Sequence, residues 1–431
     1  MDTRNQSNIV NLPPQQLSLI YKFIVETEDK LSLAQTHPVL SEAFKIDAGN
    51  HYELLDLDSL PVKDWPFIFS ACGSTILGVM SYKVTNSIAG VMLAAKYCPN
   101  RHELFIAIRS KYWKIVKRHL DRLKKVDYLR LMNDYTPIDL MKTLLELPNL
   151  KTLKLARFNQ EDLMPIKHLQ QLQNLFIKSD YAVNMFQLCS TMSQLESLEI
   201  TCASIDIPLE KKEPLWPKLK ILCIGIEDYQ TEMPFLPSLE MLHVTFSPDM
   251  ELSELLGRSI SDYSKSLQEL RLNSDEITPV HADNAKTIGQ LKSLKSLICS
   301  NMNNAYLQFI KLDQLQMVIL QTSNNVTNSE ILRLLRGCKN LRSLDVSGCR
   351  RVNKNVVAPL LKILKQHDVQ PDDPLVLTVN FMSFGDAVQT TATDPNNNLL
   401  LIQKSNNIIC ERPYTALDAS LEIEDLSDDS F

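Results

Sequence analysis

Glycine is scarce in this chain of 431 residues, which contains only 10. None of them forms a GxGxxG or P-loop pattern, so no glycine-rich phosphate-binding loop is expected. The 8 histidines are dispersed, without HExxH or any other metal-ligand spacing. No nucleophile lies in a recognisable elbow motif. These absences argue against an enzyme, and we expect no catalytic residue, no cofactor and no metal.

The 9 cysteines include no CxxC pair, and their number is odd. This argues against both a disulfide framework and a zinc site, so most thiols are expected to be reduced and buried. The first eleven residues are polar and lack the apolar core of a signal peptide. We therefore expect an intracellular protein, in the cytoplasm, the nucleus or both.

Long apolar runs are also few, and only one stretch needs a test for a membrane helix. Residues Trp65–Tyr82 contain no charged side chain over 18 positions, which is near the minimum for a spanning helix. However, Pro66, Gly73, Gly78 and several hydroxyl side chains interrupt the stretch. We predict a buried helix followed by a strand near Ile76–Met80, and no membrane partner.

The net charge of -6 is located at one end of the chain. Residues Thr415–Phe431 contain six acidic and no basic side chains, so the remainder balances at 45 acidic and 45 basic groups. Such a body has no global field suited to nucleic acid. One exception is a basic helix face that comprises Lys114, Lys117, Arg118, Arg122 and Lys125. It could belong to a phosphate- or calmodulin-binding helix. We favour a solvated helix on the convex side, between two strands.

Leucine is abundant, and it recurs at one internal spacing. The pattern LxxLxL, with an occasional Val, Ile or Cys, begins at ten positions: Val126, Leu150, Leu172, Leu195, Leu219, Leu239, Leu267, Leu294, Leu315 and Leu341. The separations are 24, 22, 23, 24, 20, 28, 27, 21 and 26 residues. A period in the twenties with this motif is the signature of a leucine-rich repeat solenoid, in which stacked units share one core.

Each repeat should begin with a short parallel strand and continue into a polar turn and a helix. In the helix expected at 329–336, Ser329 is a candidate N-cap. The consensus places Asn or Cys three residues after the last strand leucine, but here only Cys349 matches, with Asp180 as one possible substitute. We therefore expect an α/β-repeat horseshoe with a parallel concave sheet and uneven repeat lengths over residues 48–383.

Three short amphipathic helices are predicted before the repeats. The first has Leu17, Ile20, Tyr21 and Ile24 at i, i+3, i+4 and i+7 after a Pro-Pro start. The second begins near Thr27, and the third follows a His-Pro break. Three small helices make a poor independent core, so this segment should need a neighbour or a partner to cover its apolar surface.

The opening Leu-Pro, the spaced apolar residues and the stretch DKLSLAQTHPVLSEAF resemble the F-box, over residues 9–47. Combined with the repeats, the chain is similar to F-box/leucine-rich-repeat proteins. That resemblance implies a substrate-recognition subunit of an SCF (Skp1–cullin–F-box) ubiquitin ligase, which binds Skp1 directly, cullin through Skp1, and an unknown protein substrate through the repeats. It also implies a set of Skp1-contacting residues: Leu12, Pro13, Leu17, Ile20, Leu31, Leu33, Ala34 and Val39.

The segment departs from the F-box pattern near its third helix. His37-Pro38 replaces the more usual small and basic residues, and Leu40 and Phe44 stand near a frequent Trp. A helical cap on a leucine-rich-repeat scaffold or inhibitor, with no ligase role, is the alternative, because solenoids need their terminal repeats covered.

Two apolar clusters are expected on the concave face, at the strand positions that alternate with the core leucines. These predicted substrate-binding residues are Ile221, Cys223 and Met241 in the first cluster, and Ile298, Met317 and Ile319 in the second. Coverage by the chain's own tail or by irregular packing is the alternative explanation.

The repeats should end with a strand at Leu375–Val379. We predict that residues 384–431 are irregular and form a tail outside the repeats. Within it, Leu399–Ile402 could anchor the chain, whereas the acidic end Thr415–Phe431 should be mobile.

Overall fold

The computed structural model divides the chain into two compact units, which are described separately. Unit 1 comprises Met1–Met250 with Glu254–Ser266, and unit 2 comprises Glu251–Ser253 with Leu267–Phe431. The residues that the structure describes are 9–49, 51–120, 122–133, 140–158, 160–206, 215–229, 232–246, 251–274, 282–301, 311–380, 384 and 398–404. The acidic end 415–431, predicted to be mobile, lies outside these described residues.

Unit 1 is built on parallel strands in sequence order, apart from β7, which pairs with β8 beside the main path. Its strands are β1 (Leu54–Asp56), β2 (Gly78–Met80), β3 (Glu103–Ile108), β4 (Tyr128–Asn133), β5 (Thr152–Ala156), β6 (Asn174–Lys178), β7 (Val183–Asn184), β8 (Ser197–Ile205), β9 (Ile221–Tyr229) and β10 (Met241–Phe246). The register aligns equivalent repeat positions: Leu129 is opposite Leu153, and Leu153 is opposite Leu175. All three are fully buried, as the LxxLxL spacing requires.

Unit 2 continues the same architecture. Its strands are β11 (Glu269–Ser274), β12 (Ser296–Ser300), β13 (Met317–Gln321), β14 (Ser343–Asp345), β15 (Leu375–Val379) and β16 (Leu400–Lys404), paired in parallel and in sequence order. Each of the ten predicted LxxLxL motifs therefore provides one strand. The predicted leucine-rich repeat fold is confirmed.

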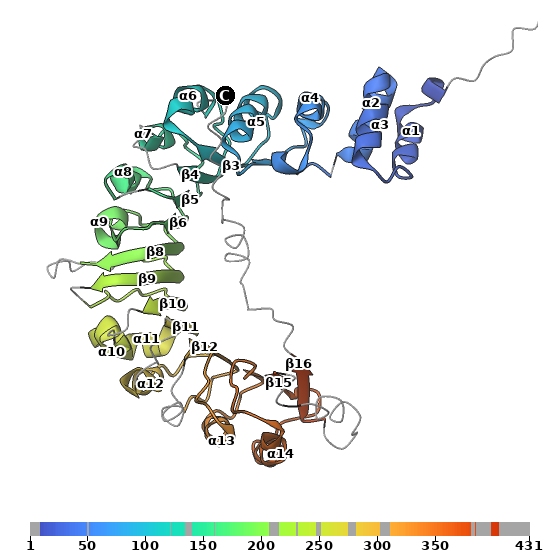
Figure 1. Cartoon of the computed structure of the whole chain (residues 1–431). Helices are drawn as coiled ribbons and strands as arrows, with labels where there is room; N and C mark the ends of the chain where they lie inside the picture. The colour runs from blue at the N-terminus through green and yellow to red at the C-terminus, as the bar shows by residue number, and fades with distance from the viewer. Residues whose placement is uncertain are drawn as a thin grey trace, which may run out of the picture. The chain divides into compact units, whose positions relative to one another are not determined.

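The helices cover one face of the sheet in each unit (Figure 1). In the repeats they are α4 (Trp65–Cys72), α5 (Val84–Tyr97), α6 (Trp113–Leu120), α7 (Leu140–Leu144), α8 (Gln160–Leu163), α9 (Met185–Cys189), α10 (Leu252–Leu256), α11 (Ile260–Ser266), α12 (Ala282–Ile288), α13 (Asn328–Gly337) and α14 (Val357–Gln366). We call the opposite side of each sheet, where the described residues place no helix, the helix-free face.

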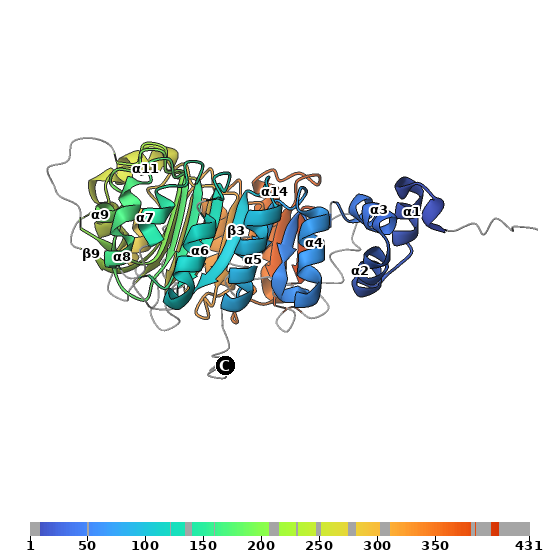
Figure 2. The same ribbon diagram turned by 90° about the horizontal axis from the view of Figure 1, so that it is seen from above.

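Three further helices precede the first strand: α1 (Pro14–Tyr21), α2 (Thr27–Thr36) and α3 (Pro38–Ala48). In unit 1 they gather beyond α4, at the end of the sheet where the first repeat begins (Figure 2). The three predicted N-terminal helices are therefore present, separate from the repeats but next to them.

The uncharged stretch Trp65–Tyr82 forms α4 and β2, as predicted from its interruptions. No helix among the described residues has both the length and the apolar character needed to cross a bilayer.

The prediction of an irregular segment from residue 384 onward is wrong for Leu400–Lys404. This segment is β16, which pairs in register with β15 from Leu375↔Leu400 to Val379↔Lys404. Leu400 and Ile402 point into the core, whereas Leu401 is exposed. This alternation of buried and exposed side chains continues the repeat pattern. The pairing of β16 also provides hydrogen-bond partners for the backbone groups at the edge of β15.

Side chains in the loops after two of the strands form hydrogen bonds with carbonyl oxygens of the backbone. Cys349 behaves as the consensus predicts, since its Sγ lies 3.8 Å from the carbonyl oxygen of Leu320 in the preceding repeat. In the repeat of β6, Ser179 has a similar role. Its hydroxyl donates to the carbonyl oxygens of Phe158 and Tyr181, at 3.3 and 2.9 Å. The role of Asp180, the next residue, stays a prediction.

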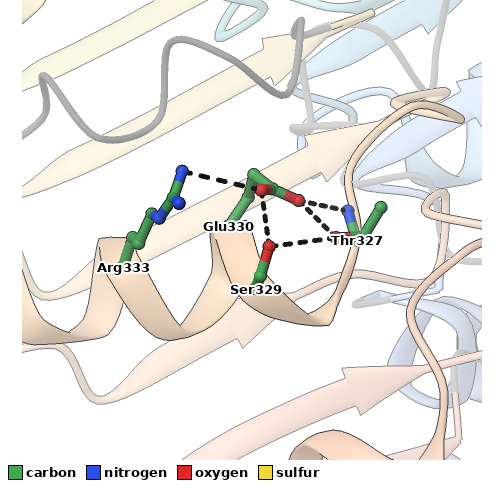
Figure 3. Close-up of polar contacts among 4 residues, drawn as sticks. All are labelled: Thr327, Ser329, Glu330 and Arg333. Atoms are coloured by element: carbon green, nitrogen blue, oxygen red, sulfur yellow. Dashed lines mark hydrogen bonds and ion pairs between the residues drawn. The ribbon is translucent and has the colours of Figure 1, made fainter.

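Helix α13 begins two residues earlier than the candidate cap Ser329 implied. Its N-cap is Thr327, whose backbone N–H donates to Glu330 Oε2 at 3.2 Å (Figure 3). The hydroxyls of Thr327 and Ser329 also donate to the Glu330 carboxylate, and Arg333 lies 3.9 Å away. Glu330 thus satisfies backbone and hydroxyl donors in the first turn.

We expect Glu330→Gln to destabilise unit 2 by about 1 kcal/mol near neutral pH. Burial raises the pKa of Glu330, but the hydrogen bonds from Ser329 and Thr327 outweigh it and hold that pKa below its ordinary value of 4.5. Because the folded pKa is the lower one, the stabilisation is complete above the unfolded pKa and is lost as pH falls through the folded value. Urea denaturation at a series of acidic pH values measures the free energy of unfolding of both proteins. The advantage of the wild type over Glu330→Gln should shrink as the pH falls. A difference between the two proteins that is the same at every pH would contradict this prediction.

Candidate functional site

The N-terminal helices enclose a small core of their own. Leu17 and Tyr21 of α1, Leu31 and Ala34 of α2, and Phe44 of α3 are all buried. The Tyr21 hydroxyl donates to the carbonyl oxygen of Leu40 at 3.0 Å, and burial raises the Tyr21 pKa to about 12. The rings of Tyr21 and Phe44 meet edge-on with centroids 5.7 Å apart. The segment is therefore a packed helical unit.

This packing corrects part of the predicted Skp1-contacting set. Leu17, Leu31 and Ala34 form the interior, so in this conformation they cannot touch a partner directly. Sequence periodicity identified them as apolar and spaced, but periodicity does not say which apolar face turns inward. The other predicted residues are accessible: Leu12 and Pro13 are exposed, and Ile20, Leu33 and Val39 are half-buried.

Sequence reasoning missed the most exposed apolar side chains of the segment. Leu19 is 53% exposed, and Phe23 and Val25 are 86% and 88% exposed. Leu19 lies within α1, whereas Phe23 and Val25 follow the end of that helix at Tyr21. We call Leu12, Leu19, Phe23 and Val25 the N-terminal apolar surface.

The same helices also contact the first repeat. The Phe44 ring lies 5.8 Å from Phe67 of α4 and 6.2 Å from Tyr52, measured between centroids. Gln35 Nε2 donates to Asp64 Oδ1 at 3.3 Å. Helix α3 therefore covers the end of the repeat core, as a cap would.

On the helix-free face of unit 1, the structure brings the first predicted cluster together. Ile221 of β9 is directly opposite Met241 of β10, and Cys223 is opposite His243. Ile221, Cys223 and Met241 are all half-buried, and therefore partly accessible. Their role as a partner-binding site stays a prediction.

The second predicted cluster, on unit 2, is corrected. Register places Met317 opposite Ser296 and Ile298 opposite Ile319, so the residues are neighbours. However, Ile298 is only 2% exposed and Ile319 only 8%, and only Met317 is half-buried. Both faces of β12 are buried, whereas alternation had implied one open face. The two isoleucines are therefore core residues, and an Asp there would destabilise the fold.

A row of aromatic and basic side chains on the helix-free face of unit 1 was not predicted. It comprises Phe105, Arg130, Lys154 and Phe176. The prediction for this face considered apolar clusters alone, and the juxtaposition of the two basic residues was therefore overlooked.

No group of three or more His, Cys, Asp or Glu side chains suited to a metal ion occurs among the described residues. All described cysteines except Cys223 are buried, and none is in a disulfide. Burial raises the pKa of the Cys72 thiol to about 11, and that of Cys349 to about 12. Such thiols are poor nucleophiles at neutral pH, as expected of core residues.

Neither a protein-family model nor a curated protein sequence matches this chain. Among solved structures, it is similar to an internalin from Listeria monocytogenes, at 15% identity over 83% of this chain and 97% of that one, with a TM-score of 0.42. It is similar to a chain of the yeast Rad7–Elc1 complex, at 14% identity over 90% and 92%, with a TM-score of 0.38. A TLR13–ssRNA13 complex gives 15% identity over 82% of this chain and 62% of that one, with a TM-score of 0.41.

Proposed function

We propose that the chain is a non-catalytic substrate receptor of an SCF ubiquitin ligase, whose N-terminal helices bind Skp1. One observation carries this proposal: a packed three-helix unit leaves Leu19, Phe23 and Val25 exposed to solvent. Large apolar side chains exposed to water are unfavourable, and where they gather on a surface they mark an interaction site. The resemblance of residues 9–47 to the F-box supplies the identity of the partner.

In this proposal the repeats bind a protein substrate on the helix-free face, with Ile221, Cys223 and Met241 among the contacts. The chain performs no chemistry itself. It holds the substrate near a ubiquitin-charged enzyme that Skp1 and cullin recruit, which raises the effective concentration of the reacting groups. The proposed compartments are the cytoplasm and the nucleus.

A second candidate is a repeat scaffold or inhibitor whose N-terminal helices serve only as a cap. The contacts of Phe44 with Phe67 and of Gln35 with Asp64 favour it, because they join α3 and its neighbours to the first repeat. A cap explains these contacts, but it does not explain why Phe23 and Val25 face solvent.

We expect Leu19→Ser combined with Phe23→Ser to weaken binding of purified Skp1 by tenfold or more, because exposed anchor residues would be lost from the interface. The thermal unfolding temperature should hardly change, since neither side chain is in a core. Titration calorimetry with full-length proteins measures the affinity. Tyr181→Ser is the matched control, because Tyr181 is an exposed aromatic residue in a later repeat.

Failure of the wild-type chain to bind Skp1 would refute the ligase proposal and favour the scaffold. Equal binding by the wild type and the double variant would place the Skp1 contacts elsewhere, and would refute the role of the N-terminal apolar surface. The combination Leu12→Ala with Pro13→Ala tests the exposed part of the originally predicted set in the same assay.

A further inference from the structure

The basic face predicted from the sequence lies on α6, which packs between α5 and α7 on the helix-covered side of the sheet in unit 1 (Figure 1). Residues 109–125 contain eight basic side chains and one acidic side chain, Asp121, which lies outside the described residues. Four of the five predicted basic side chains are exposed, namely Lys114, Arg118, Arg122 and Lys125. The positive charge of the chain is therefore concentrated at the solvent side of one helix.

The apolar side of α6 is not available to a partner. Trp113, Val116 and Leu120 are all buried in the repeats. A calmodulin-like protein binds a basic amphipathic helix by enclosing its apolar anchors in a groove. Because these anchors are already buried, any binding by α6 must use its exposed side alone.

The stability of the helix does not account for the cations on that side. Lys114 lies in the first turn of α6, which contains no acidic residue, and a cation is unfavourable at this end of the helix dipole. Lys114 and Arg118 are four residues apart in the helix, where like charges repel each other. Burial, and then the charges of Arg122 and Arg118, lower the pKa of His119 below its ordinary value of 6.5. Both guanidinium groups therefore lie near this one imidazole.

An aliphatic side chain is exposed among these cations. Ile115 is 42% exposed, and it lies three residues before Arg118 in α6, so the two side chains are neighbours on the helix. Exposed apolar residues that border arginine are typical of protein–protein interfaces, in which arginine is enriched and apolar contacts form the centre. We call Lys114, Ile115, Arg118 and Arg122 the α6 surface.

We propose that the α6 surface binds an acidic segment of a protein partner, a contact additional to those in the proposed function. Carboxylates of that segment pair with Lys114, Arg118 and Arg122, and an aliphatic side chain packs on Ile115. A guanidinium binds a carboxylate through two parallel hydrogen bonds, and the lysine ammonium adds a point charge. Cations at an exposed surface also attract an acidic partner before contact, which raises the association rate.

The side chains of this surface favour a protein over a single-stranded nucleic acid. Sites for single strands combine cations with aromatic rings on which the bases stack. The aromatic residues next to the α6 surface do not offer such rings, because Tyr112 is half-buried and Trp113 is buried.

The neighbouring helices also favour a protein over an anionic membrane. A membrane would face several helices at once, but α5 and α7 contain one lysine each, and exposed Glu146 closely follows α7. Apolar side chains that hold a protein on a bilayer reach below the headgroups. Ile115 is less than half exposed, so it suits contact with another protein surface better.

The test uses the full-length chain and four probes at low salt. Anisotropy titration measures binding of a fluorescent Gly-Ser peptide with a run of Glu around a central Leu, of the same peptide with Gln in place of Glu, and of single-stranded oligo-dT. Co-sedimentation measures binding to vesicles of phosphatidylserine and phosphatidylcholine. We expect the Glu peptide to bind most tightly, with an affinity that falls as salt is raised.

Lys114→Gln combined with Arg118→Gln should weaken binding of the Glu peptide about tenfold, because two charge-assisted contacts are lost. Ile115→Ser should weaken it by a smaller factor, because an apolar contact is lost. The unfolding temperature should stay the same or rise slightly in the double variant, since repulsion between like charges is relieved. A structural role of these side chains would lower it instead.

Lys362→Gln combined with Lys365→Gln is the matched control. It also removes two charges from exposed positions of one helix, here α14, and should bind the Glu peptide like the wild type. An equal loss in both double variants would indicate a non-specific charge effect and would overturn the inference.

No binding of the Glu peptide, equal binding of the Glu and Gln peptides, or an unchanged affinity of the Lys114/Arg118 variant would also overturn it. Binding of oligo-dT or of vesicles as tight as that of the Glu peptide would replace the protein partner with a nucleic acid or a membrane. None of these outcomes depends on Skp1, because only the purified chain and the probe are present. The calorimetric titration of Skp1 therefore reports on the proposed ligase role independently.

Discussion

Replacing Phe44 with Ala should lower the free energy of unfolding of the N-terminal part of unit 1 by about 3–5 kcal/mol, the cost typical of removing a buried aromatic side chain. Phe44 is 1% exposed, and its ring packs near the rings of Tyr21 in α1, of Phe67 in α4 and of Tyr52. The substitution therefore leaves a cavity that both the three-helix core and the first repeat line. Urea denaturation combined with amide exchange measures the loss and its location.

Phe23→Ala is the matched control, because Phe23 is exposed and its removal should change stability by less than about 0.5 kcal/mol. The distribution of exchange also separates the two proposed roles. Loss of protection in α1–α3 alone would indicate a domain that folds separately, whereas loss extending into α4 would indicate a cap coupled to the repeats. If Phe44→Ala were as mild as Phe23→Ala, the packing of α3 described above would be refuted.

Gly225→Ala should destabilise unit 1 by at least about 1–3 kcal/mol, which is the usual cost of inserting extra atoms into a well-packed interior. A Cβ on Gly225 of β9 would overlap the carbonyl oxygen of Thr201 in β8. This close approach accompanies the irregular register between Ile200 and Ala203. Because the obstacle is backbone, β8 and β9 must separate, and the half-buried Ile221 and Cys223 on β9 would be displaced with them.

Amide exchange of β8, β9 and β10 should show the damage, and urea denaturation should give its size. Gly49→Ala provides the control, since a Cβ there meets only the Lys45 carbonyl oxygen, at 3.1 Å, at the end of α3. That substitution should be close to neutral, because the reduced freedom of the unfolded chain offsets a small steric cost. Unchanged protection of β8–β10 in Gly225→Ala would contradict the close approach of the two strands.

The candidate sites were only partly predictable from the sequence. Ile221 and Met241 lie opposite each other as predicted, because the LxxLxL spacing fixes which strand positions are in register. The same rule places Arg130 opposite Lys154, whereas the contact of Lys154 with the Phe176 ring is known only from the structure. By contrast, Phe23 lies just beyond the end of α1, where no periodic pattern indicates its exposure.

By itself, the sequence determined the repeat architecture and the number of its central strands. The two-residue period of a strand fixes the side of the sheet to which each strand leucine of the LxxLxL motif projects. The motif recurs every 20 to 28 residues, and these units must stack because no single unit can bury its own apolar face. It also determined the three N-terminal helices, since spacing, prolines and caps act locally.

Only the tertiary structure decided which side of an apolar segment is hidden. Leu17 and Leu19 are equally apolar, yet one is in the core and the other faces solvent, because the positions of α2 and α3 decide it. Ile298 and Ile319 had the same pattern as accessible residues, and the structure buries them. The edge of β15 likewise paired with Leu400–Lys404, a segment without the repeat motif. Burial depends on contacts between residues distant in sequence, and local spacing contains no information about those contacts.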